Sequence, residues 1–501
     1  MKVAFLSMPF QQPLPAVAPI LLAGICSKAG IEAKGYDFAF DWYDHFSKHK
    51  DWVKIKHLLA IATKSEQFHW SNVKAFLKFN KEYIMQFKDY DWIGLSVFTV
   101  ESYDYAKIMT YSIRRWLPHI KIVVGGKGIE TQESSTQLWH SDIWYEHGMC
   151  DLLMVGDCEH TIADCLKKGT TGIYRSSAQT KKELDDIPLA QWNDYDLKKY
   201  LKYRKGVIDD GDKPYMAITS SKGCVRRCSF CDVVSFWPRY IYRDPDKVAD
   251  EIITNYRATG ITDFFFTDNL MNGSVTNFRK INQRLVDEIP GEITYGGYAI
   301  FRGKNQMPVK DFELAAQAGS KWWSIGLESG SERLRYDIGK KFTDEDLDWT
   351  ANLLAKNKIF QQWLLIVGYP SESDEDFQKT LDMLYRYRHL AKTGMVEINV
   401  TPTFQLLRNS PIMMNAHIRD KLGLSHNMDN PNIDKFWTST VYPENTFPVR
   451  AERYRIITDV IAECGYGQQN IEMLEKYKAD IDHQEQMYYE KYPQFKSKIS
   501  A

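Results

Sequence analysis

Three cysteines lie close together near the middle of the sequence, as Cys224-Val-Arg-Arg-Cys228-Ser-Phe-Cys231. Three thiolates at these spacings on one loop can bind three irons of a cubane iron–sulfur cluster. The fourth iron is then left without a protein ligand, so a small chelating molecule can bind there. Structural zinc is a rival interpretation, but zinc requires four closed tetrahedral ligands, and no fourth cysteine or histidine is near in the sequence. A chance cluster of free thiols is the other alternative.

The remaining cysteines are scattered along the chain, and we expect them to be buried structural thiols. They are Cys26, Cys150, Cys158, Cys165 and Cys464. Eight cysteines in 501 residues are too few for a disulfide scaffold, which favours a reducing compartment.

Composition excludes several classes of function. The 64 basic and 65 acidic residues give a net charge of −1, and no basic stripe indicates a nucleic-acid partner. No apolar run approaches the roughly 18 residues of a membrane span. The apolar N-terminus is broken by Ser7 and Pro9. We therefore expect a cytoplasmic protein with no membrane partner.

The cysteine loop directly follows an apolar, strand-like segment at Tyr215–Thr219, and helical patterns separate it from five similar segments. These are Asp263–Thr267, Glu292–Ala299, Lys321–Leu327, Gln362–Val367 and Val396–Val400. Six β/α units predict a partial (β/α)6 TIM-type barrel over residues 214–411, with ligands at the carboxyl ends of its strands. Three of the helices are predicted to begin at a hydroxyl cap with an acid three residues later. The pairs are Ser329 with Glu332, Thr343 with Asp346 and Ser373 with Asp376.

The first part of the chain has the same α/β alternation. Apolar strand-like segments near residues 3–6, 36, 92–98, 120–124 and 152–155 alternate with helical patterns. This pattern predicts an N-terminal Rossmann-like domain at residues 1–178, a doubly wound parallel sheet. Residues 179–213 lose apolar periodicity and are predicted to form a linker, in which Trp192 and Tyr195 indicate some packing. Residues 412–501 are predicted to form a helical C-terminal region.

The cysteine triplet resembles the hallmark of the radical S-adenosylmethionine (SAM) superfamily, Cys-x3-Cys-x2-Cys after the first barrel strand. Phe230 occupies the place of the family's aromatic residue before the last cysteine. The resemblance implies that Cys224, Cys228 and Cys231 hold a [4Fe-4S] cluster whose open iron binds SAM. It also implies that an electron from a flavodoxin- or ferredoxin-type donor cleaves SAM to a 5′-deoxyadenosyl radical. The radical would attack an unknown organic substrate inside the barrel, where water is excluded.

Three later segments are similar to the SAM-binding segments of that family. They are Phe264-Phe-Phe-Thr-Asp268-Asn269 after the second strand, Ile325-Gly-Leu-Glu328-Ser329-Gly330 after the fourth and Leu365-Ile-Val-Gly368-Tyr-Pro370-Ser-Glu372 after the fifth. Asn269 departs from the family's second acid. The resemblance implies SAM contacts at Phe230, Asp268, Glu328, Ser329, Gly368 and Pro370. Each segment also has a structural interpretation, as an acid at a helix N-terminus or a glycine in a turn.

A Rossmann-like domain before such a barrel resembles the cobalamin-binding subgroup of the superfamily. The resemblance implies cobalamin contacts in the loops after three predicted strands, at Ser96, Thr99, Gly125, Gly126, Gly156 and Glu159. Asp157 and Cys158 depart from the usual Gly-Glu-Gly-Glu. No Asp-x-His-x-x-Gly motif is present, so no histidine ligand is expected on the lower face of the cobalamin. A domain that has lost its ligand, or that binds a different one, is the alternative.

With cobalamin, the expected reaction is methylation of an unactivated carbon. The alternatives are a cobalamin-independent radical SAM enzyme that catalyses a cyclisation or rearrangement, and a non-catalytic iron–sulfur electron carrier. Methylthiolation is not favoured, because it requires a second cysteine triad in the front domain. The sequence identifies no catalytic residue beyond the cofactor ligands.

Overall fold

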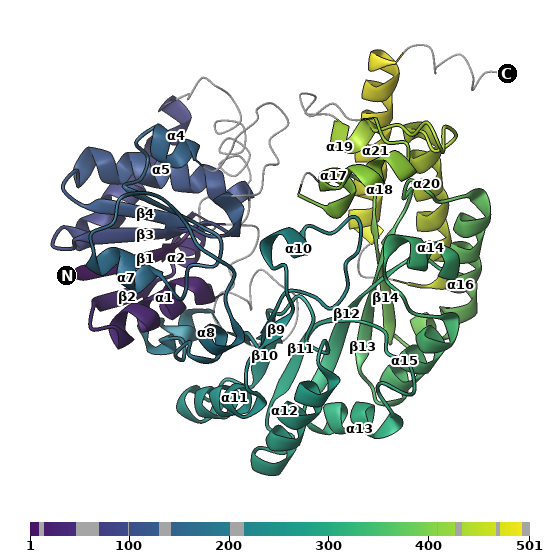
Figure 1. Ribbon diagram of the computed structural model, residues 1–501, viewed down its shortest axis with the longest axis horizontal. Coiled ribbons are helices and arrows are strands. Elements are labelled where there is room, and N and C mark those ends of the chain that lie inside the picture. Colours follow the sequence, from purple (N-terminus) through teal and green to yellow (C-terminus); the bar gives the residue numbers. More distant parts are fainter. Residues whose placement is uncertain are drawn as a thin grey trace. The chain divides into compact units, whose positions relative to one another are not determined.

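The computed structural model describes residues 1–9, 15–46, 70–98, 100–129, 142–200, 215–407, 409–425, 433–466 and 471–492. The chain folds into two compact units, Met1–Ala217 and Ile218–Ala501 (Figure 1). Within the described ranges, none of the helices combines the length and the hydropathy that a bilayer span requires.

The first unit is built on a six-stranded sheet in the order β2-β1-β3-β4-β5-β6, and each neighbouring pair is parallel. The strands are β1 (Lys2–Ser7), β2 (Glu32–Tyr36), β3 (Trp92–Ser96), β4 (Lys121–Gly125), β5 (Leu152–Val155) and β6 (Gly172–Arg175). The strand order reverses at β1, which confirms the predicted doubly wound sheet. The sequence analysis missed β6, because this edge strand alternates half-buried with exposed residues and has no buried apolar run.

Helices cover both faces of this sheet. They are α1 (Val17–Lys28), α2 (Phe38–Phe46), α4 (Trp70–Ile84), α5 (Val100–Trp116), α6 (Ile143–Glu146), α7 (Ile162–Lys167) and α8 (Lys181–Asp185). Successive residues of β4 enter different apolar clusters: Ile122 and Val124 enter one, and Val123 enters the other. Burial on both faces explains why the strands of this sheet appear in the sequence as continuous apolar runs.

The beginning of the predicted linker packs against the first unit. Trp192 and Tyr195 are buried, as their aromatic character indicated. The Tyr195 hydroxyl donates to the carbonyl of Ala16 at 2.8 Å, and the Gly35 N–H donates to the Asp194 carboxylate at 2.8 Å. The segment up to residue 200 therefore contributes to the core of this unit, and residues 201–213 of the predicted linker lie outside the described residues.

The second unit contains a six-stranded sheet in the order β14-β13-β12-β11-β10-β7, with parallel pairing from β10 to β14. The strands are β7 (Tyr215–Ile218), β10 (Asp263–Phe266), β11 (Thr294–Ala299), β12 (Ser320–Glu328), β13 (Phe360–Ile366) and β14 (Val396–Thr401). All six predicted strands are present within two residues of their expected bounds. β7 and β14 are the two edges of the sheet, so the partial barrel is confirmed. A short antiparallel pair, β8 (Ser221–Lys222) and β9 (Ile241–Tyr242), flanks the cysteine loop.

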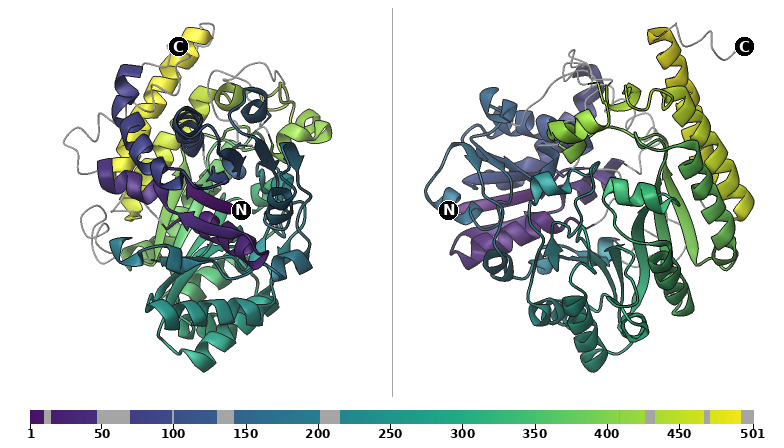
Figure 2. Two further views of the ribbon diagram at one scale, coloured as in Figure 1. Left: turned by 90° about the vertical axis from the view of Figure 1, so that its left-hand side faces the viewer. Right: turned by 45° about the vertical axis from the view of Figure 1, so that its right-hand side comes forward.

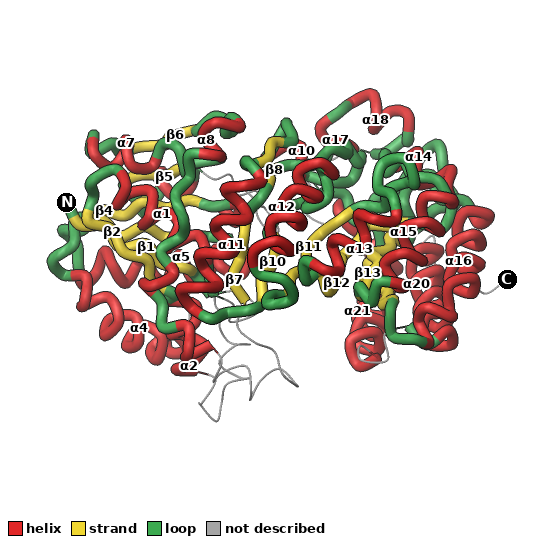
Figure 3. Tube along the Cα trace, turned by 90° about the horizontal axis from the view of Figure 1, so that it is seen from below, coloured by secondary structure: helices red, strands yellow, loops and turns green. Residues whose placement is uncertain are grey.

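Helices run along one side of this sheet, as the view from below shows (Figure 3). They are α11 (Pro245–Thr259), α12 (Val275–Glu288), α13 (Val309–Gln317), α15 (Asp344–Lys356) and α16 (Asp374–Lys392). Two shorter helices, α10 (Val233–Phe236) and α14 (Glu332–Ile338), lie in loops that follow the carboxyl ends of strands. The alternation of strand and helix thus leaves the loops that carry the predicted motifs at one edge of the sheet.

The C-terminal region is helical, as predicted. It contains α17 (Pro411–Met414), α18 (Ala416–Lys421), α19 (Ile433–Phe436), α20 (Phe447–Cys464) and α21 (Ile471–Lys491). α20 contacts both α16 and α21. Figure 2 shows the two long C-terminal helices beside the green helices that pack on the second sheet. The Tyr466 hydroxyl donates to the carbonyl of Leu384 at 2.9 Å, which ties the end of α20 to α16.

Candidate cofactor site

The cysteine loop follows β7 and β8 at the carboxyl edge of the second sheet. Cys228 is buried, whereas Cys224 and Cys231 are half-buried. The Cys231 N–H donates to the carbonyl of Cys228 at 3.2 Å, and the Arg226 N–H donates to Cys224 Sγ at 3.3 Å. Burial raises the pKa of the Cys228 thiol to about 12. Without a metal, this burial favours the neutral thiol over the thiolate.

The cysteines do not form a site for a single ion in the described part of the chain. Within the described residues, no three or more His, Cys, Asp or Glu side chains are arranged to hold a single metal ion. A cubane takes one thiolate on each of three different irons, so its protein ligands lie farther apart than those of one ion.

Other parts of the second unit hold the cysteine loop in place. The Ser229 N–H donates to the carbonyl of Ile338 at 2.9 Å, and its hydroxyl lies 2.8 Å from the Tyr369 hydroxyl. Cys228 belongs to one apolar cluster with Leu334, Ile338, Ile366 and Tyr369, and Phe230 and Cys231 pack against it. The fold thereby brings the cysteine loop to α14, which follows the predicted contacts Glu328 and Ser329, and to the end of β13, which precedes Gly368 and Pro370.

Gly339 permits this close packing. Its φ is +101°, and a Cβ there would lie 3.0 Å from the carbonyl oxygen of Arg227. A residue with a side chain at this position would have an unfavourable left-handed backbone conformation and would come into close contact with the cysteine loop.

Asp268 joins the second strand to the segment after the first. It is buried and accepts the N–H groups of Ser220 and Ser221 at 2.7 and 3.0 Å, together with the Ser220 hydroxyl. Burial raises the pKa of Asp268, although these hydrogen bonds oppose the rise. The carboxylate therefore positions the start of the cysteine loop, and its predicted contact with SAM stays a prediction.

Glu328 ends β12 in a strained conformation. Its φ is +66°, and the pairing of β12 with β13 shifts register between Gly326 and Glu328. The carboxylate forms an ion pair with Lys340 at 2.7 Å, and both side chains are about nine-tenths buried. A left-handed non-glycine residue at a strand end is typical of a functional site.

Lys340 links Glu328 to the cysteine loop. Its ammonium lies 5.9 Å from the centre of the Phe230 ring. Burial by itself would lower the pKa of Lys340, but the Glu328 carboxylate and the cysteine sulfurs raise it above its ordinary value. The sequence analysis missed this residue, because nothing in the spacing pairs it with Glu328.

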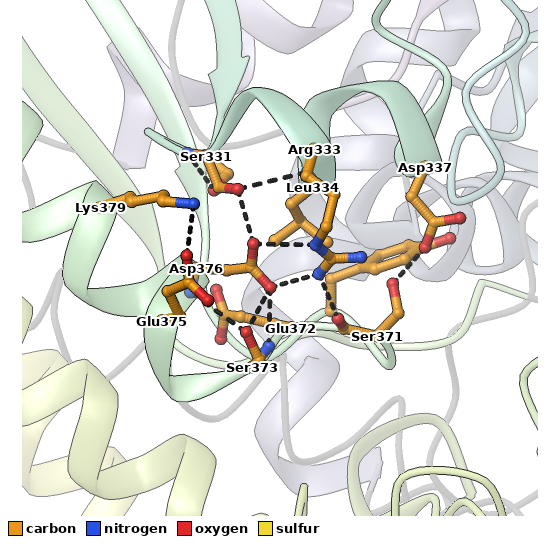
Figure 4. Close-up of polar contacts among 12 residues, drawn as sticks. Ser331, Arg333, Leu334, Asp337, Ser371, Glu372, Ser373, Glu375, Asp376 and Lys379 are labelled. Atoms are coloured by element: carbon orange, nitrogen blue, oxygen red, sulfur yellow. Dashed lines mark hydrogen bonds and ion pairs between the residues drawn. The ribbon is translucent and has the colours of Figure 1, made fainter.

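A network centred on Asp376 connects the fourth-strand segment to the fifth (Figure 4). Asp376 accepts the Ser331 hydroxyl at 2.6 Å, the Ser373 hydroxyl at 2.7 Å and the guanidinium of Arg333. Burial alone would raise the pKa of Asp376, but these hydrogen bonds hold it below its ordinary value. The Ser371 hydroxyl also bonds to Asp337 of α14.

One predicted helix cap in this region, that of α14, differs from the structure. The cap of α14 is Ser331, which accepts the Leu334 N–H at 3.4 Å, so the predicted cap at Ser329 is wrong. The Ser329 hydroxyl instead lies 3.1 Å from the Thr380 hydroxyl and accepts the Ser331 N–H, so α16 fixes its position. The other two predicted caps are confirmed as capping boxes, at Thr343 and Ser373.

The loop after β13 is held by α20 and the residues before it. Glu372 Oε2 accepts the Gly368 N–H at 2.8 Å and forms an ion pair with Arg453 at 2.9 Å. Asn445 donates to the carbonyls of Tyr369 and Pro370 at 2.8 and 3.2 Å. Burial raises the pKa of Glu372 to about 7, although Arg453 opposes this rise. Sequence reasoning missed Asn445 and Arg453, which lie more than 70 residues from their partners.

In the first unit, the described residues among the predicted cobalamin contacts lie at the carboxyl ends of β3 and β4 or in the loops after β4 and β5. These strands are neighbours, so Ser96, Gly125, Gly126, Gly156 and Glu159 lie at one edge of the sheet. Thr99 lies outside the described residues.

Close backbone packing explains two of these glycines. Gly126 has φ +109°, and a Cβ there would lie 2.5 Å from the carbonyl oxygen of Val97. Gly156 has φ +89°, and its Cβ would lie 2.9 Å from the carbonyl oxygen of Ser176. At the same edge, the Phe98 side chain is 62% exposed.

The family of the second unit follows from comparison with known proteins. Residues 218–384 match the model of the radical SAM superfamily. The chain carries a radical SAM domain. The matched residues begin in β7 and end in α16, so they include the cysteine loop and the ends of β10, β12 and β13.

Curated relatives match part of the chain. Anaerobic magnesium-protoporphyrin IX monomethyl ester cyclase of Synechocystis sp. is 27% identical over 302 residues, which cover 56% of this chain and 56% of the relative. Cytidylyl-2-hydroxyethylphosphonate methyltransferase of Streptomyces wedmorensis is 24% identical over 216 residues, which cover 40% of this chain and 38% of the relative. The chain therefore spans about half of these relatives or less.

Solved structures share the fold over most of the chain. The radical SAM methyltransferase TsrM of Kitasatospora setae, with cobalamin and a [4Fe-4S] cluster bound, has a TM-score of 0.57 at 15% identity, covering 86% of this chain and 77% of its own. The cobalamin-dependent SAM radical enzyme OxsB, with aqua-cobalamin and SAM bound, has a TM-score of 0.60 at 16% identity, covering 91% of this chain and 66% of its own. At these identities the likeness concerns the fold alone.

Proposed function

We propose that this chain is a radical SAM enzyme that binds a [4Fe-4S] cluster and SAM in its second unit, and that it uses cobalamin to methylate an unactivated carbon. One observation carries the proposal: Cys228, α14 and the loop after β13 meet in a single apolar cluster. Segments that are far apart in the sequence thus pack against the cysteine loop, which supports the proposed site.

The residues have distinct roles in this proposal. Cys224, Cys228 and Cys231 each bind one iron, and the fourth iron is left for the amino and carboxylate groups of SAM. When bound, the cluster and SAM supply a 5′-deoxyadenosyl radical, and cobalamin supplies a methyl group. A flavodoxin- or ferredoxin-type protein is the proposed electron donor.

The second unit's own side chains prepare the SAM site. Glu328 is held by Lys340, so its carboxylate is fixed before SAM arrives. Gly368 and Pro370 belong to a loop whose backbone is fixed by Glu372 and Asn445. Phe230 places an aromatic face beside the last cysteine of the loop. Groups fixed in advance lose little entropy on binding, so this arrangement suits a site that must align SAM with an iron.

The proposed cobalamin site is the carboxyl edge of the first sheet. Ser96, Thr99, Gly125, Gly126, Gly156 and Glu159 are the proposed contacts. Ligands of doubly wound sheets bind at this edge, and an exposed apolar side chain, Phe98, lies there. TsrM and OxsB, which share the fold, are described as binding cobalamin.

The front-unit cysteines favour methyl transfer over methylthiolation. Cys150 is buried in one apolar cluster, whereas Cys26 and Cys165 are buried in the other. Burial raises the pKa values of Cys26 and Cys150 to about 12. Cys158 packs against the cluster that holds Cys26 and Cys165, so only Cys150 is separated from the other front-unit thiols. Cyclisation is the second candidate reaction, because a cyclase is among the relatives.

An anaerobic assay tests the proposal. The purified chain is reconstituted with iron and sulfide and given SAM and a strong reductant, with and without methylcobalamin. 5′-Deoxyadenosine together with S-adenosylhomocysteine, formed only with methylcobalamin, is the expected result. 5′-Deoxyadenosine alone would favour the cobalamin-independent enzyme, and neither product would indicate an electron carrier.

Two variants test the cluster ligands directly. Cys228→Ala should abolish the visible absorbance of the reconstituted cluster, because one iron loses its protein ligand. Cys464→Ala is the control, since that thiol is also buried but lies at the end of α20. Retained absorbance in Cys228→Ala, or tetrahedral zinc in the purified chain, would contradict the assignment.

A further inference from the structure

The barrel helices cover one face of the second sheet, whereas parallel sheets are usually covered on both (Figure 3). Along β13 and β14, buried residues alternate with half-buried or exposed ones. On β12, the buried Trp323 ring packs against Phe278 of α12 and Phe312 of α13. The preceding residue, Trp322, is only half-buried and lies on the opposite face, which we name the open face. Strand register places five further residues on the open face, namely Phe265, Gly296, Tyr298, Ser324 and Gln362.

Two aromatic rings form a flat surface on the open face. Phe265 of β10 and Trp322 of β12 are in register with Gly296 of β11, which lies between them. Their rings stack across β11, with 5.6 Å between their centres and 13° between their planes. Bulky branched side chains usually fill the interior of a closed barrel, and this stacked pair takes their place here. We name Phe265 and Trp322 the aromatic platform.

Gly296 makes room for the aromatic platform. A Cβ at Gly296 would lie 2.3 Å from Cε2 of the Trp322 ring and 2.4 Å from both Cδ2 and Nε1. Because these distances are nearly equal, a face of the ring rather than its edge covers Gly296. The φ of Gly296 is not positive, so the neighbouring ring, and not the backbone, requires glycine here. A glycine inside a strand is typical of a place that another group approaches closely.

Polar side chains lie beside the aromatic platform, nearer the carboxyl edge. Tyr298 is two residues after Gly296 and is in register with Ser324, which is in register with Gln362. The Ser324 hydroxyl donates to Gln362 Oε1 at 3.1 Å. Among the described residues, neither the Tyr298 hydroxyl nor the Gln362 amide nitrogen has a hydrogen-bond partner, and Tyr298 is 46% exposed. Both groups can therefore bond to a ligand.

The aromatic platform is far from the predicted SAM contacts. Trp322 is the third residue of β12, and Glu328 is the last. At about 3.3 Å per residue, about 20 Å of strand separates them. The polar side chains of Tyr298 and Ser324 lie along this distance. The platform therefore suits a molecule other than SAM, one that extends from the platform toward the carboxyl edge.

We propose that the open face binds the organic substrate through a planar unsaturated ring, which stacks on Phe265 and Trp322, and a polar group, which bonds to Tyr298 and Gln362. Aromatic side chains stack on planar π systems, and an apolar lining with a few polar groups is typical of small-molecule sites. The substrate class is thus an extended molecule with a conjugated ring at one end. The inference rests on the proposed function for the place of the reaction.

Binding measurements with matched probes test the inference. The probes are naphthalene-2-carboxamide, which is planar, and decahydronaphthalene-2-carboxamide, which is saturated and not planar. Equilibrium dialysis measures both on the full chain, with and without the reconstituted cluster. Trp322→Leu removes the ring and keeps an apolar side chain, whereas Trp322→Phe keeps a ring. Tyr385→Leu is the control, because this tyrosine is exposed on α16 and donates to Glu463.

The wild type should bind the planar probe about fivefold or more tightly than the saturated probe, because stacking adds to the burial of apolar area. Trp322→Leu should remove this preference, and Trp322→Phe and the control should keep it. Gly296→Ala should weaken the preference, since a Cβ there displaces the Trp322 ring. Tyr298→Phe should weaken both probes about equally, because it removes a hydrogen bond and leaves the aromatic platform intact.

Adenosine, as a third probe, separates the substrate from SAM. Its affinity should be the same in the wild type and in Trp322→Leu. Loss of adenosine binding in Trp322→Leu would assign the aromatic platform to SAM and overturn the inference. Failure of the planar probe to bind, equal affinity of the two carboxamides for the wild type, or the same preference in Trp322→Leu would also overturn it. The wild-type comparison needs no variant, so it holds even where a variant does not fold.

The probe measurements are independent of the proposed function. They require neither SAM nor turnover, so a planar preference that depends on Trp322 can be measured when no 5′-deoxyadenosine forms. That combination would count against the radical chemistry and would leave the ring site in place. Failure of the ring site and failure of the radical chemistry are therefore distinguishable.

Discussion

Arg453→Met leaves a buried carboxylate without its cation. Glu372 would keep the Gly368 N–H as a hydrogen-bond donor but lose the ion pair at 2.9 Å, and its side chain is only 1% exposed. Removing one partner of a buried ion pair costs about 3–5 kcal/mol. We therefore expect the second unit of the variant to unfold at a clearly lower urea concentration than the wild type.

The pH dependence makes this prediction specific. Burial already raises the pKa of Glu372 to about 7 from 4.5, and loss of Arg453 raises it further. A raised carboxyl pKa in the folded state means that stability falls as pH rises between the unfolded and folded values. In the wild type this loss is complete near pH 7. In the variant it continues above pH 7, at up to about 1.4 kcal/mol per pH unit.

Urea unfolding at pH 7.0 and 8.5, followed by tryptophan fluorescence, measures the effect. The chain has two units, so the transition of the second unit is compared between variants rather than converted to a total free energy. The double variant Arg453→Met/Glu372→Gln removes the buried charge, and we expect it to recover much of the stability and to lose the extra pH dependence. Equal midpoints for wild type and Arg453→Met at pH 8.5, or no recovery in the double variant, would show that the Glu372–Arg453 ion pair does not stabilise the second unit.

Three further predictions concern other positions. Gly368→Ala should lower both the stability of the second unit and its affinity for SAM, because the φ of Gly368 is +81° and a Cβ would lie 2.4 Å from the Arg450 side chain. Gly465→Ala is the control, since Gly465 has the same φ of +81° but open space around it. We expect this control to lower the free energy of thermal unfolding by only about 1 kcal/mol. Burial raises the pKa of Asp37, so the stability of the wild-type first unit should fall as pH rises above 3.8. Asp37→Asn should remove this pH dependence of the stability. The same pH profile of unfolding in the variant and the wild type would contradict the prediction. Lys340→Met should lower the unfolding midpoint by leaving its carboxylate partner unpaired but should retain the cluster absorbance, because Lys340 is not an iron ligand.

Local patterns predicted most of the elements. Strands such as Asp263–Phe266 and Val396–Thr401 are short apolar runs between helical patterns, and that periodicity depends only on neighbouring residues. The capping boxes at Thr343 and Ser373 are equally local, because both partners lie within four residues. The cap at Ser329 failed because two serines compete there, and a tertiary contact with Thr380 on α16 engages the first of them.

The cysteine triplet, the α/β order and the segments that resemble SAM-binding loops can be identified from the amino-acid sequence, since each is a run of consecutive residues. The side chains that support them become known only from the folded packing. Lys340 pairs with Glu328, and Arg453 pairs with Glu372 across 81 residues, because these contacts depend on how strands and helices pack. Burial then sets the energetic consequence of each pairing, and burial is a property of the whole fold rather than of any segment.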